Sequence, residues 1–248
     1  MPVIQIKPDT LNEENARFRQ TRLEQPLFLN SVPKSGSHLL RNIVRMFVPV
    51  DQQYDKQFIQ WGNLQEHVEA FESPDNFLSW GHLLYSDASA IETGRARKLI
   101  LVRDPYSWVL ARGRFFVSDE FKGNAERLKE AGLGVEDLLN LMIFGIHQKA
   151  PPMRELYDFN AVAWLGTRAT LVRYEELVAA VKAIESADAD DYFLKLLTAC
   201  GIDRPADWRQ RVNIGADRKQ SGTARENLST SGFDFPDELP EMQKSLVD

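Results

Sequence analysis

The stretch FLNSVPKSGSHLLRNIV, residues 28–44, decides the fold. A short apolar run breaks at Pro33, passes through a lysine and a Ser-Gly-Ser turn, and resumes with apolar residues at helical spacing. This pattern predicts a buried strand over residues 27–32, a tight turn, and a helix that begins near Ser37. A turn of this kind, between a buried strand and a helix, is where parallel sheets hold ligands.

The turn has the chemistry of an anion-binding site. Lys34 adds a full positive charge, and Gly36 permits close approach of the backbone to a ligand. Ser35 and Ser37 supply hydroxyl groups, and the helix start offers unpaired N–H groups and the positive end of its dipole. These features predict a phosphate site; the alternative is a helix start with an exposed lysine. In the phosphate loop of nucleotide triphosphatases the lysine follows the glycine, whereas here it comes first.

A second candidate anion site occurs in LVRDPYSWVLA, residues 101–111. Arg103 follows an aliphatic run (KLILV) that predicts the clearest buried strand, and Pro105 begins the next helix. An arginine at this position can bind a phosphate through two parallel hydrogen bonds. An ion pair with Asp104 is the alternative role.

Strand patterns alternate with helix patterns along the chain. This alternation predicts an α/β fold with a central, mainly parallel sheet flanked by helices on both faces. We also expect an arm or frayed helix over residues 1–25 and a loop over 49–61. The other expected elements are strands at 77–80 (ending at Gly81-His82), 98–102 and 170–172, the last two buried, and helices at 63–71, 105–117, 135–147, 153–164, 175–184 and 191–200.

Composition limits the possible functions. The 248 residues are 43% hydrophobic and 27% charged, which is ordinary for a soluble globular protein, and residues 26–248 are expected to form one domain. A net charge of −6 argues against a nucleic-acid binder. Cys200 is the only cysteine, so a disulfide within the chain is excluded and a cytoplasmic location fits. The sequence shows neither a signal peptide nor a membrane-spanning run, so no membrane association is expected.

The two loops, PKSGSHLL (33–40) and VRDPYSWVLA (102–111), resemble the cofactor signatures of sulfotransferases that use 3′-phosphoadenosine 5′-phosphosulfate (PAPS). Further segments are similar to the family's in the same order: WGHLLY (80–85), LVRYEEL (171–177) and DRKQSG (217–222). The resemblance to this soluble, cytosolic-type family implies a P-loop-nucleotide-kinase-like sulfotransferase architecture.

The resemblance also implies the reaction, which is transfer of a sulfonate group from PAPS to a hydroxyl or amine of an acceptor. The product of the cofactor would be 3′,5′-adenosine bisphosphate (PAP). Lys34 would stabilise the leaving phosphate oxygen, and His82 would take the acceptor's proton. Of the other histidines, His67 and His147 fall in helical patterns that favour structural roles, and His38 is expected to contact phosphate. No metal is required, and the sequence has no clustered pattern of metal ligands.

The resemblance assigns the remaining site residues to the cofactor. Arg103 would hold the 3′-phosphate together with Arg218 and Lys219, which lie in a loop over residues 213–233 that is expected to cover the cofactor. Tyr174 would approach the adenine. The cofactor-binding residues that the resemblance implies are Lys34, Ser35, Gly36, Ser37, His38, Arg103, Tyr174, Arg218 and Lys219.

Three positions depart from the family's pattern. Leu39 replaces an aromatic residue, Ala111 a serine, and Gln220 a glycine. Two alternatives therefore stay open: a non-catalytic nucleotide-binding protein of the same fold, and a nucleotide kinase-like phosphotransferase, for which Asp104 is the one candidate magnesium ligand at a strand end. We expect a small-molecule acceptor. The aromatic candidates for its pocket are Phe58, Trp61, Tyr85, Phe115 and Phe116.

Overall fold

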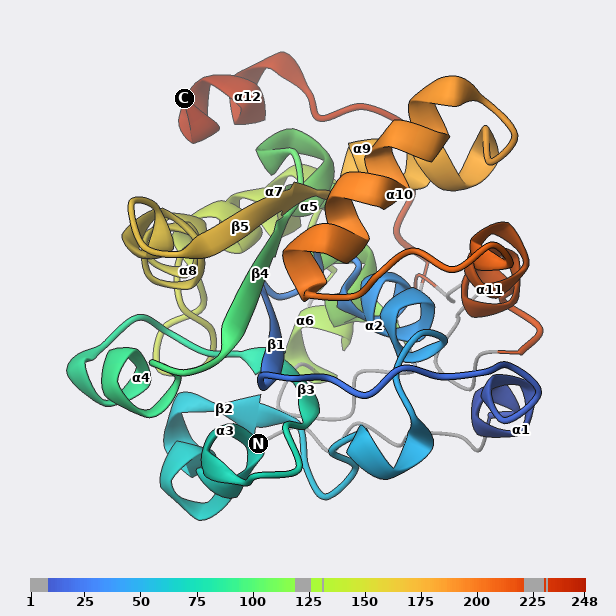
Figure 1. Cartoon of the computed structure of the whole chain (residues 1–248). Helices are drawn as coiled ribbons and strands as arrows, with labels where there is room; N and C mark the ends of the chain where they lie inside the picture. The colour runs from blue at the N-terminus through green and yellow to red at the C-terminus, as the bar shows by residue number, and fades with distance from the viewer. Residues whose placement is uncertain (1–8, 119–125, 131, 221–229, 231) are drawn as a thin grey trace.

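The computed structural model describes residues 9–118, 126–130, 132–220, 230 and 232–248. Among these residues, five parallel strands form one sheet in the order β2-β3-β1-β4-β5 (Figure 1). The strands are β1 (Leu27–Ser31), β2 (Ile59–Gln60), β3 (Leu78–His82), β4 (Arg97–Val102) and β5 (Ala169–Arg173).

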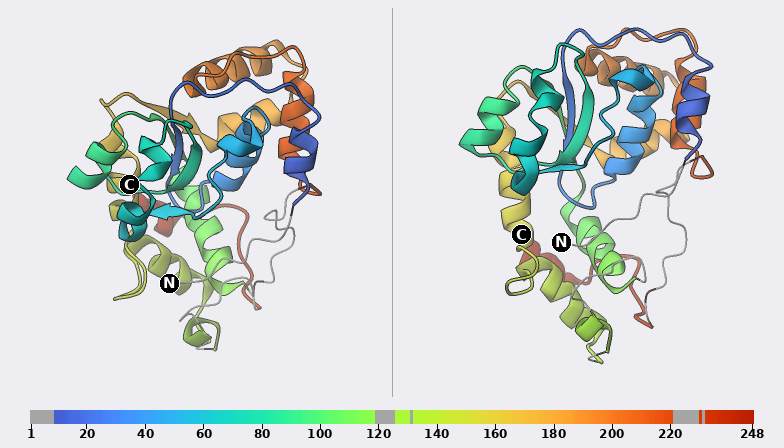
Figure 2. Two further views of the ribbon diagram at one scale, coloured as in Figure 1. Left: turned by 60° about the horizontal axis from the view of Figure 1, so that its bottom comes forward. Right: turned by 90° about the horizontal axis from the view of Figure 1, so that it is seen from below.

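Helices cover both faces of this sheet. In Figure 2, α1, α2 and α11 lie on one side of the strands, and α3 and α4 lie on the other. The predicted α/β fold with a parallel sheet between helices is therefore confirmed. The α-helices are α1 (Leu11–Asn15), α2 (Ser37–Arg45), α3 (Glu69–Glu72), α4 (Asp87–Glu92), α5 (Pro105–Val117), α6 (Glu126–Glu130), α7 (Val135–Phe144), α8 (Met153–Asn160), α9 (Tyr174–Lys182), α10 (Ala187–Cys200), α11 (Trp208–Ala216) and α12 (Glu241–Val247), and the 3₁₀ helices are η1 (Val50–Gln52), η2 (Trp61–His67) and η3 (Val162–Trp164).

Alternating side chains of the central strands build a core on each face. Leu29 of β1 and Leu99 of β4 pack in the cluster formed with α2, α9, α10 and α11. Ile100 of β4 packs with α5, α7 and α8, and Phe28 of β1 packs with residues of η2 and α3. Successive residues of a strand point to opposite faces, so a strand that is apolar throughout must be covered on both sides.

The strand pairing brings the carboxyl ends of the strands to one edge. Asn30 pairs with Gly81, Ser31 with Leu101, and Val102 with Arg173, so the loops after β1, β3, β4 and β5 emerge together. The strand β1 has β3 on one side and β4 on the other, which makes it the point where the strand order reverses. Open parallel sheets hold their ligands at such a point.

Several predicted elements have other bounds in the structure. The helix predicted over residues 135–147 ends at Phe144, so His147 lies in the loop after it instead of in a helix. The helix predicted over 153–164 divides into α8 and the 3₁₀ helix η3, and the one predicted over 191–200 begins at Ala187. The loop predicted over 49–61 contains η1 and β2.

Two further elements differ in type or in burial. Residues 63–71 form the 3₁₀ helix η2 followed by the short α3 instead of one α-helix. The strand predicted at residues 170–172 exists, but Leu171 is 45% exposed because β5 is the edge strand of the sheet. The run of apolar residues predicted this strand correctly. Such a run does not show whether the strand is central in the sheet or at its edge.

The loop predicted over residues 213–233 begins later than expected. The helix α11 continues to Ala216, because its apolar face packs on α2. Residues 221–229 and 231 of the predicted loop lie outside the described residues, as do residues 119–125 between α5 and α6.

The contact between α11 and α2 depends on a glycine. A Cβ added to Gly215 would lie 2.7 Å from the carbonyl oxygen of Asn42 and 2.7 Å from Cα of Ile43. Both are backbone atoms, so we expect Gly215→Ala to lower the free energy of unfolding by about 1–3 kcal/mol in urea denaturation. Gly62→Ala is the matched control, because a Cβ there meets nothing within 4 Å. Equal denaturation midpoints for the two variants would contradict this packing.

Candidate active site

The loop between β1 and α2 adopts a left-handed turn. Lys34 has a φ angle of 69° and Gly36 one of 92°, both in the region that favours glycine. The N–H group of Ser35 donates to the carbonyl oxygen of Val32 at 3.2 Å and closes the turn. A lysine in this conformation is strained, so the surrounding contacts must hold the loop in its shape.

The start of α2 fits an anionic ligand. Its N-cap residue, Gly36, makes no side-chain capping hydrogen bond within the described residues, and its first turn contains no acidic residue. The start of α5, by contrast, is capped by Asp104, whose Oδ1 accepts a hydrogen bond from the N–H group of Ser107 at 2.9 Å. Ser35 is fully buried, and its hydroxyl has no hydrogen-bond partner in the part of the chain that the structure describes. An uncapped helix start beside a buried, unsatisfied hydroxyl is suited to phosphate or sulfate oxygens.

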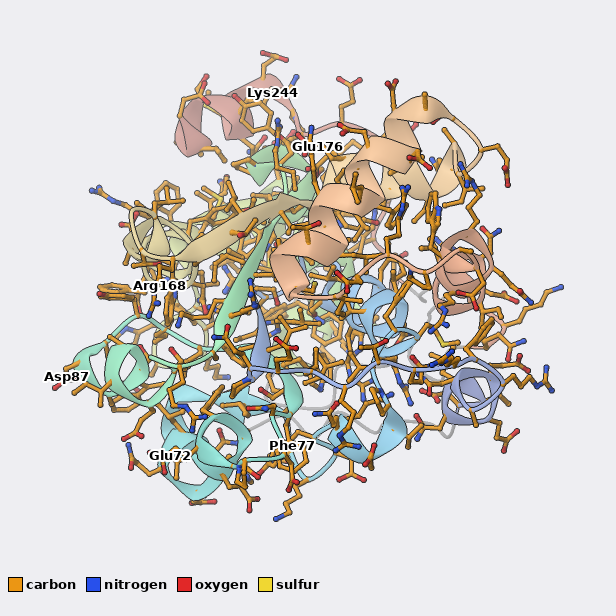
Figure 3. All side chains as sticks on the ribbon, viewed as in Figure 1. Glu72, Phe77, Asp87, Arg168, Glu176 and Lys244 are labelled. Atoms are coloured by element: carbon orange, nitrogen blue, oxygen red, sulfur yellow. The ribbon has the colours of Figure 1, made fainter. Side chains whose placement is uncertain are left out.

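Acidic side chains lie on the surface and also next to the second loop. In Figure 3, Glu72 and Asp87 lie at the edge of the view, on α3 and α4, and Glu176 lies on α9. Beside Arg103, the N–H group of Asp104 donates to Oε1 of Glu175 at 2.9 Å, so this loop contains negative as well as positive groups. No helix within the described ranges is long and apolar enough to cross a membrane. The described side chains also include no group of three or more His, Cys, Asp or Glu placed to hold a metal ion.

His82 is held by the strand next to its own. Nδ1 of His82 lies 2.9 Å from the carbonyl oxygen of Ser31 and 3.0 Å from its hydroxyl. A carbonyl oxygen only accepts hydrogen bonds, so Nδ1 carries a proton and donates it, which leaves Nε2 as the acceptor. Burial, and then the charge of Lys34, lower the pKa of His82 to about 3. The imidazole is therefore neutral at pH 7, and it lies close enough to Lys34 to interact electrostatically.

Aromatic side chains surround these two residues. Nζ of Lys34 lies 2.9 Å from the centroid of the Phe115 ring, which is a cation–π contact. The rings of Phe58 and His82 meet edge to face with their centroids 4.7 Å apart. His38 packs edge-on against Trp80 at 4.9 Å, so its imidazole is directed toward that tryptophan.

The second loop is joined to the first through Tyr174. Nε of Arg103 donates to the hydroxyl of Ser107 at 3.0 Å, and the guanidinium carbon of Arg103 lies 4.7 Å from the centroid of the Tyr174 ring. A Cβ on Gly36 would overlap the same ring. Tyr174 therefore contacts the first loop and the arginine of the second, and the glycine makes room for it.

Arg218 and Lys219 lie in a turn after α11 with their side chains exposed. Nη1 of Arg211 donates to the carbonyl oxygen of Met46 beyond the end of α2, whereas Gly215 meets the middle of that helix. The helix α11 thus runs antiparallel to α2, and the turn that follows it leads toward the start of α2.

The five aromatic candidates for an acceptor pocket divide into two groups. Phe58 and Phe115 adjoin His82 and Lys34, as described above. Tyr85 instead packs on Trp164 with ring centroids 5.0 Å apart, Trp61 is 60% exposed on η2, and Phe116 packs in the cluster of α5 and α7.

Two residues that hold the site do not stand out in the sequence. Ser31 orients His82, and the indole N–H group of Trp108 donates to the carbonyl oxygen of Pro33 in the first loop. Ser31 contacts His82 only because of the register of β1 against β3, which cannot be derived from the sequence. Trp108 lies one turn into the helix after the second loop, where an apolar residue is expected to be core.

Comparison with known proteins supports the fold. No family model and no curated protein matches the chain. Among solved structures, the crystal structure of the mouse sulfotransferase SULT7A1 complexed with PAP matches with a TM-score of 0.57 and 17% sequence identity. The match covers 87% of this chain and 71% of the mouse chain. At this level of identity the likeness shows the fold, which is the α/β fold of a sulfotransferase.

The protonation of His82 gives a first test of this site. We expect its imidazole to stay neutral, with the proton on Nδ1, from pH 7 down to about pH 4, because the folded chain lowers its pKa to about 3 from an ordinary value of about 6.5. This shift removes stability as the pH falls from about 6.5 toward 3, because the unfolded chain then binds the proton more tightly. Nitrogen-15 NMR titration of histidine-labelled protein measures the pKa.

Lys34→Met should raise the pKa of His82, since that variant removes the second cause of the shift. A titration of His82 near pH 6.5 in the folded protein would contradict the geometry.

Proposed function

We propose that this protein is a PAPS-dependent sulfotransferase that transfers a sulfonate group to a hydroxyl or amine of a small molecule. The observation that carries the proposal is the meeting of three features at the carboxyl edge of one sheet. These are the uncapped start of α2, the ammonium of Lys34, and a neutral imidazole at His82 with Nε2 as its acceptor atom. The sulfotransferase-like fold agrees with this assignment.

The two loops divide the cofactor between them in this proposal. The start of α2, with Ser37, His38 and the unsatisfied hydroxyl of Ser35, would bind the 5′-phosphosulfate. Arg103 would bind the 3′-phosphate, joined by Arg218 and Lys219 from the turn after α11.

Tyr174 supports this division, because its ring lies beside Gly36 of the first loop and against the guanidinium of Arg103. In this proposal it would contact the adenine. The hydroxyl of Ser107 lies beside Arg103, one turn before Ala111, and offers a polar group where the family's serine is missing.

The catalytic step assigns one task to each of two side chains. The acceptor oxygen or nitrogen forms a bond to sulfur while the bond between sulfur and the phosphate oxygen breaks. Nε2 of His82 takes the acceptor's proton, and Lys34 stabilises the charge left on the phosphate oxygen. An anion beside Lys34 offsets the charge that lowers the pKa of His82, so the bound cofactor makes this imidazole a better base than it is in the free protein.

The walls beside these groups favour an acceptor with an apolar part. Phe58 lies against His82 and Phe115 against Lys34, so an acceptor that reaches Nε2 of His82 meets both rings. Apolar walls with a few polar groups are typical of small-molecule sites.

The two rival functions explain less of the structure. Asp104, the candidate magnesium ligand of a kinase, uses Oδ1 as the N-cap of α5. A purely binding protein gives no reason for the hydrogen bond that fixes the tautomer of His82.

Turnover by variants tests the catalytic assignment. We expect His82→Ala to lower sulfonate transfer from radiolabelled PAPS by about 10²- to 10⁴-fold, because it removes the general base, while affinity for PAP stays nearly unchanged. The acceptor is first found by screening small alcohols, phenols and amines with the wild-type protein. His147→Ala is the control, because His147 is exposed on the loop after α7. An active His82→Ala variant would show that another group takes the proton.

A further inference from the structure

Two carbonyl groups, one in each of the two candidate loops, accept hydrogen bonds from aromatic side chains, the buried Trp108 and the half-buried Tyr157. In the first loop, the indole N–H group of Trp108 donates to the carbonyl oxygen of Pro33, directly before the strained Lys34. In the second loop, the hydroxyl of Tyr157 donates to the carbonyl oxygen of Arg103 at 2.8 Å. Each bond therefore fixes the backbone at the residue that precedes or carries a cationic side chain of the site.

The two aromatic side chains touch each other. The rings of Trp108 and Tyr157 meet edge to face, with centroids 5.5 Å apart and an angle of 80° between the ring planes. Pairs with this geometry attract each other beyond the burial of their area. One continuous path of contacts thus runs from Pro33 through the two rings to Arg103, from α5 to α8.

This aromatic pair is held rigidly. Trp108 is fully buried, and the guanidinium carbon of Arg112 lies 5.0 Å from its ring centroid. The guanidinium of Arg112 is itself fixed by the carbonyl oxygens of Met142 at 2.7 Å and Pro151 at 2.8 Å. Burial, and then the charge of Asp104, raise the pKa of Tyr157, so its hydroxyl keeps the proton that it donates.

The pair is not needed to anchor either loop to the sheet. The first loop is already joined to the strands, because the N–H group of Val32 donates to the carbonyl oxygen of Leu101 at 3.0 Å. The second loop has its own bond, from the N–H group of Asp104 to Oε1 of Glu175 at 2.9 Å. What the pair adds is a hydrogen-bonded link between the backbones of the two loops, beside the side-chain contacts of Tyr174, and therefore a further constraint on their separation.

We propose that Trp108 and Tyr157 are positioning residues that act as one unit, fix the separation of the two loops, and make the site select a ligand with two phosphate groups over a ligand with one. This inference rests on the proposed function for its ligand. The mechanical link between the loops is a property of the chain alone, so the two are tested separately.

Hydrogen exchange of the free protein, measured by mass spectrometry, tests the link. Tyr157→Phe removes only the hydroxyl that bonds to the second loop, and we expect it to speed exchange of amides 34–38 in the first loop by about threefold or more. Trp108→Phe should likewise speed exchange of the amides of residues 103, 104, 106 and 107 in the second loop. A side chain that only supports its own loop would change exchange in that loop alone.

The chain offers a matched control for each variant. Tyr192 has a buried hydroxyl, and Trp164 a buried indole N–H group, with no hydrogen-bond partner in the described structure. Tyr192→Phe and Trp164→Phe make the same chemical changes without removing a hydrogen bond to either loop, so exchange of both loops should match the wild type.

Calorimetric titration tests whether the site selects a ligand with two phosphate groups over a ligand with one. We expect Tyr157→Phe to weaken PAP binding by about three- to tenfold, the cost of about one hydrogen bond, and to weaken 5′-AMP binding less than about twofold. The variant with both substitutions should lose less affinity than the product of the two single losses, because either one breaks the unit.

The outcomes separate the two claims. Exchange that changes only in the loop nearest each substitution would overturn the inference, even if PAP binds and sulfonate transfer is observed. Equal loss of affinity for PAP and 5′-AMP would overturn the selection. Cross-loop exchange in a protein that binds no PAP would support the link while removing both the proposed function and the selection of a bisphosphate.

Discussion

The parallel pairing of β1 with β3 on one side and β4 on the other is the constraint on which the rest of the structure depends. It places the loop at Lys34 beside the end of β3 and beside the loop at Arg103. Because the pairing fixes Ser31 next to His82, it also orients the imidazole without any contribution from a flexible loop. A site built on strand ends in this way keeps its geometry before a ligand arrives, which is what transfer chemistry requires.

The electrostatics of the site follow from the same arrangement. The positive charge of Lys34 disfavours a second positive charge on the nearby His82, and burial disfavours it further. The histidine is the neutral member of the pair because its ordinary pKa is the lower of the two. The outcome is one cation and one neutral base side by side. The uncapped start of α2 adds a second positive element without adding a titratable group. The end of β1 and the start of α2 therefore carry positive charge, although the chain as a whole is acidic.

Much of the fold could be predicted from the sequence, because its elements are strongly patterned. The helix over 105–117 was predicted with its observed bounds, since Pro105 marks the start and the apolar spacing continues to Val117. The strand β5 was predicted but taken as buried, because its edge position depends on pairing across the sheet. The 3₁₀ turn at η2 was missed because helical apolar spacing does not distinguish it from an α-helix over so few residues.

The residues of the candidate site also differ in whether the sequence reveals them. Residues that carry charge or conformational freedom, such as Lys34, Gly36 and Arg103, stand out in the sequence because their chemistry is unusual at a strand end. Residues that act through a backbone contact do not stand out. Trp108 and Tyr157 lie in ordinary amphipathic helices, and only the three-dimensional path between the loops gives them a role. The roles assigned by family resemblance to Arg218 and Lys219 remain proposals.

The proposed function requires that the two loops together bind an adenosine carrying two phosphates. Calorimetric titration of the wild-type protein with PAP, beside 5′-AMP and Mg·ATP, tests this claim without knowledge of the acceptor. We expect PAP to bind at about micromolar strength or better and 5′-AMP to bind at least about tenfold more weakly, a difference of about 1.4 kcal/mol. Absence of PAP binding, or a preference for Mg·ATP, would contradict it.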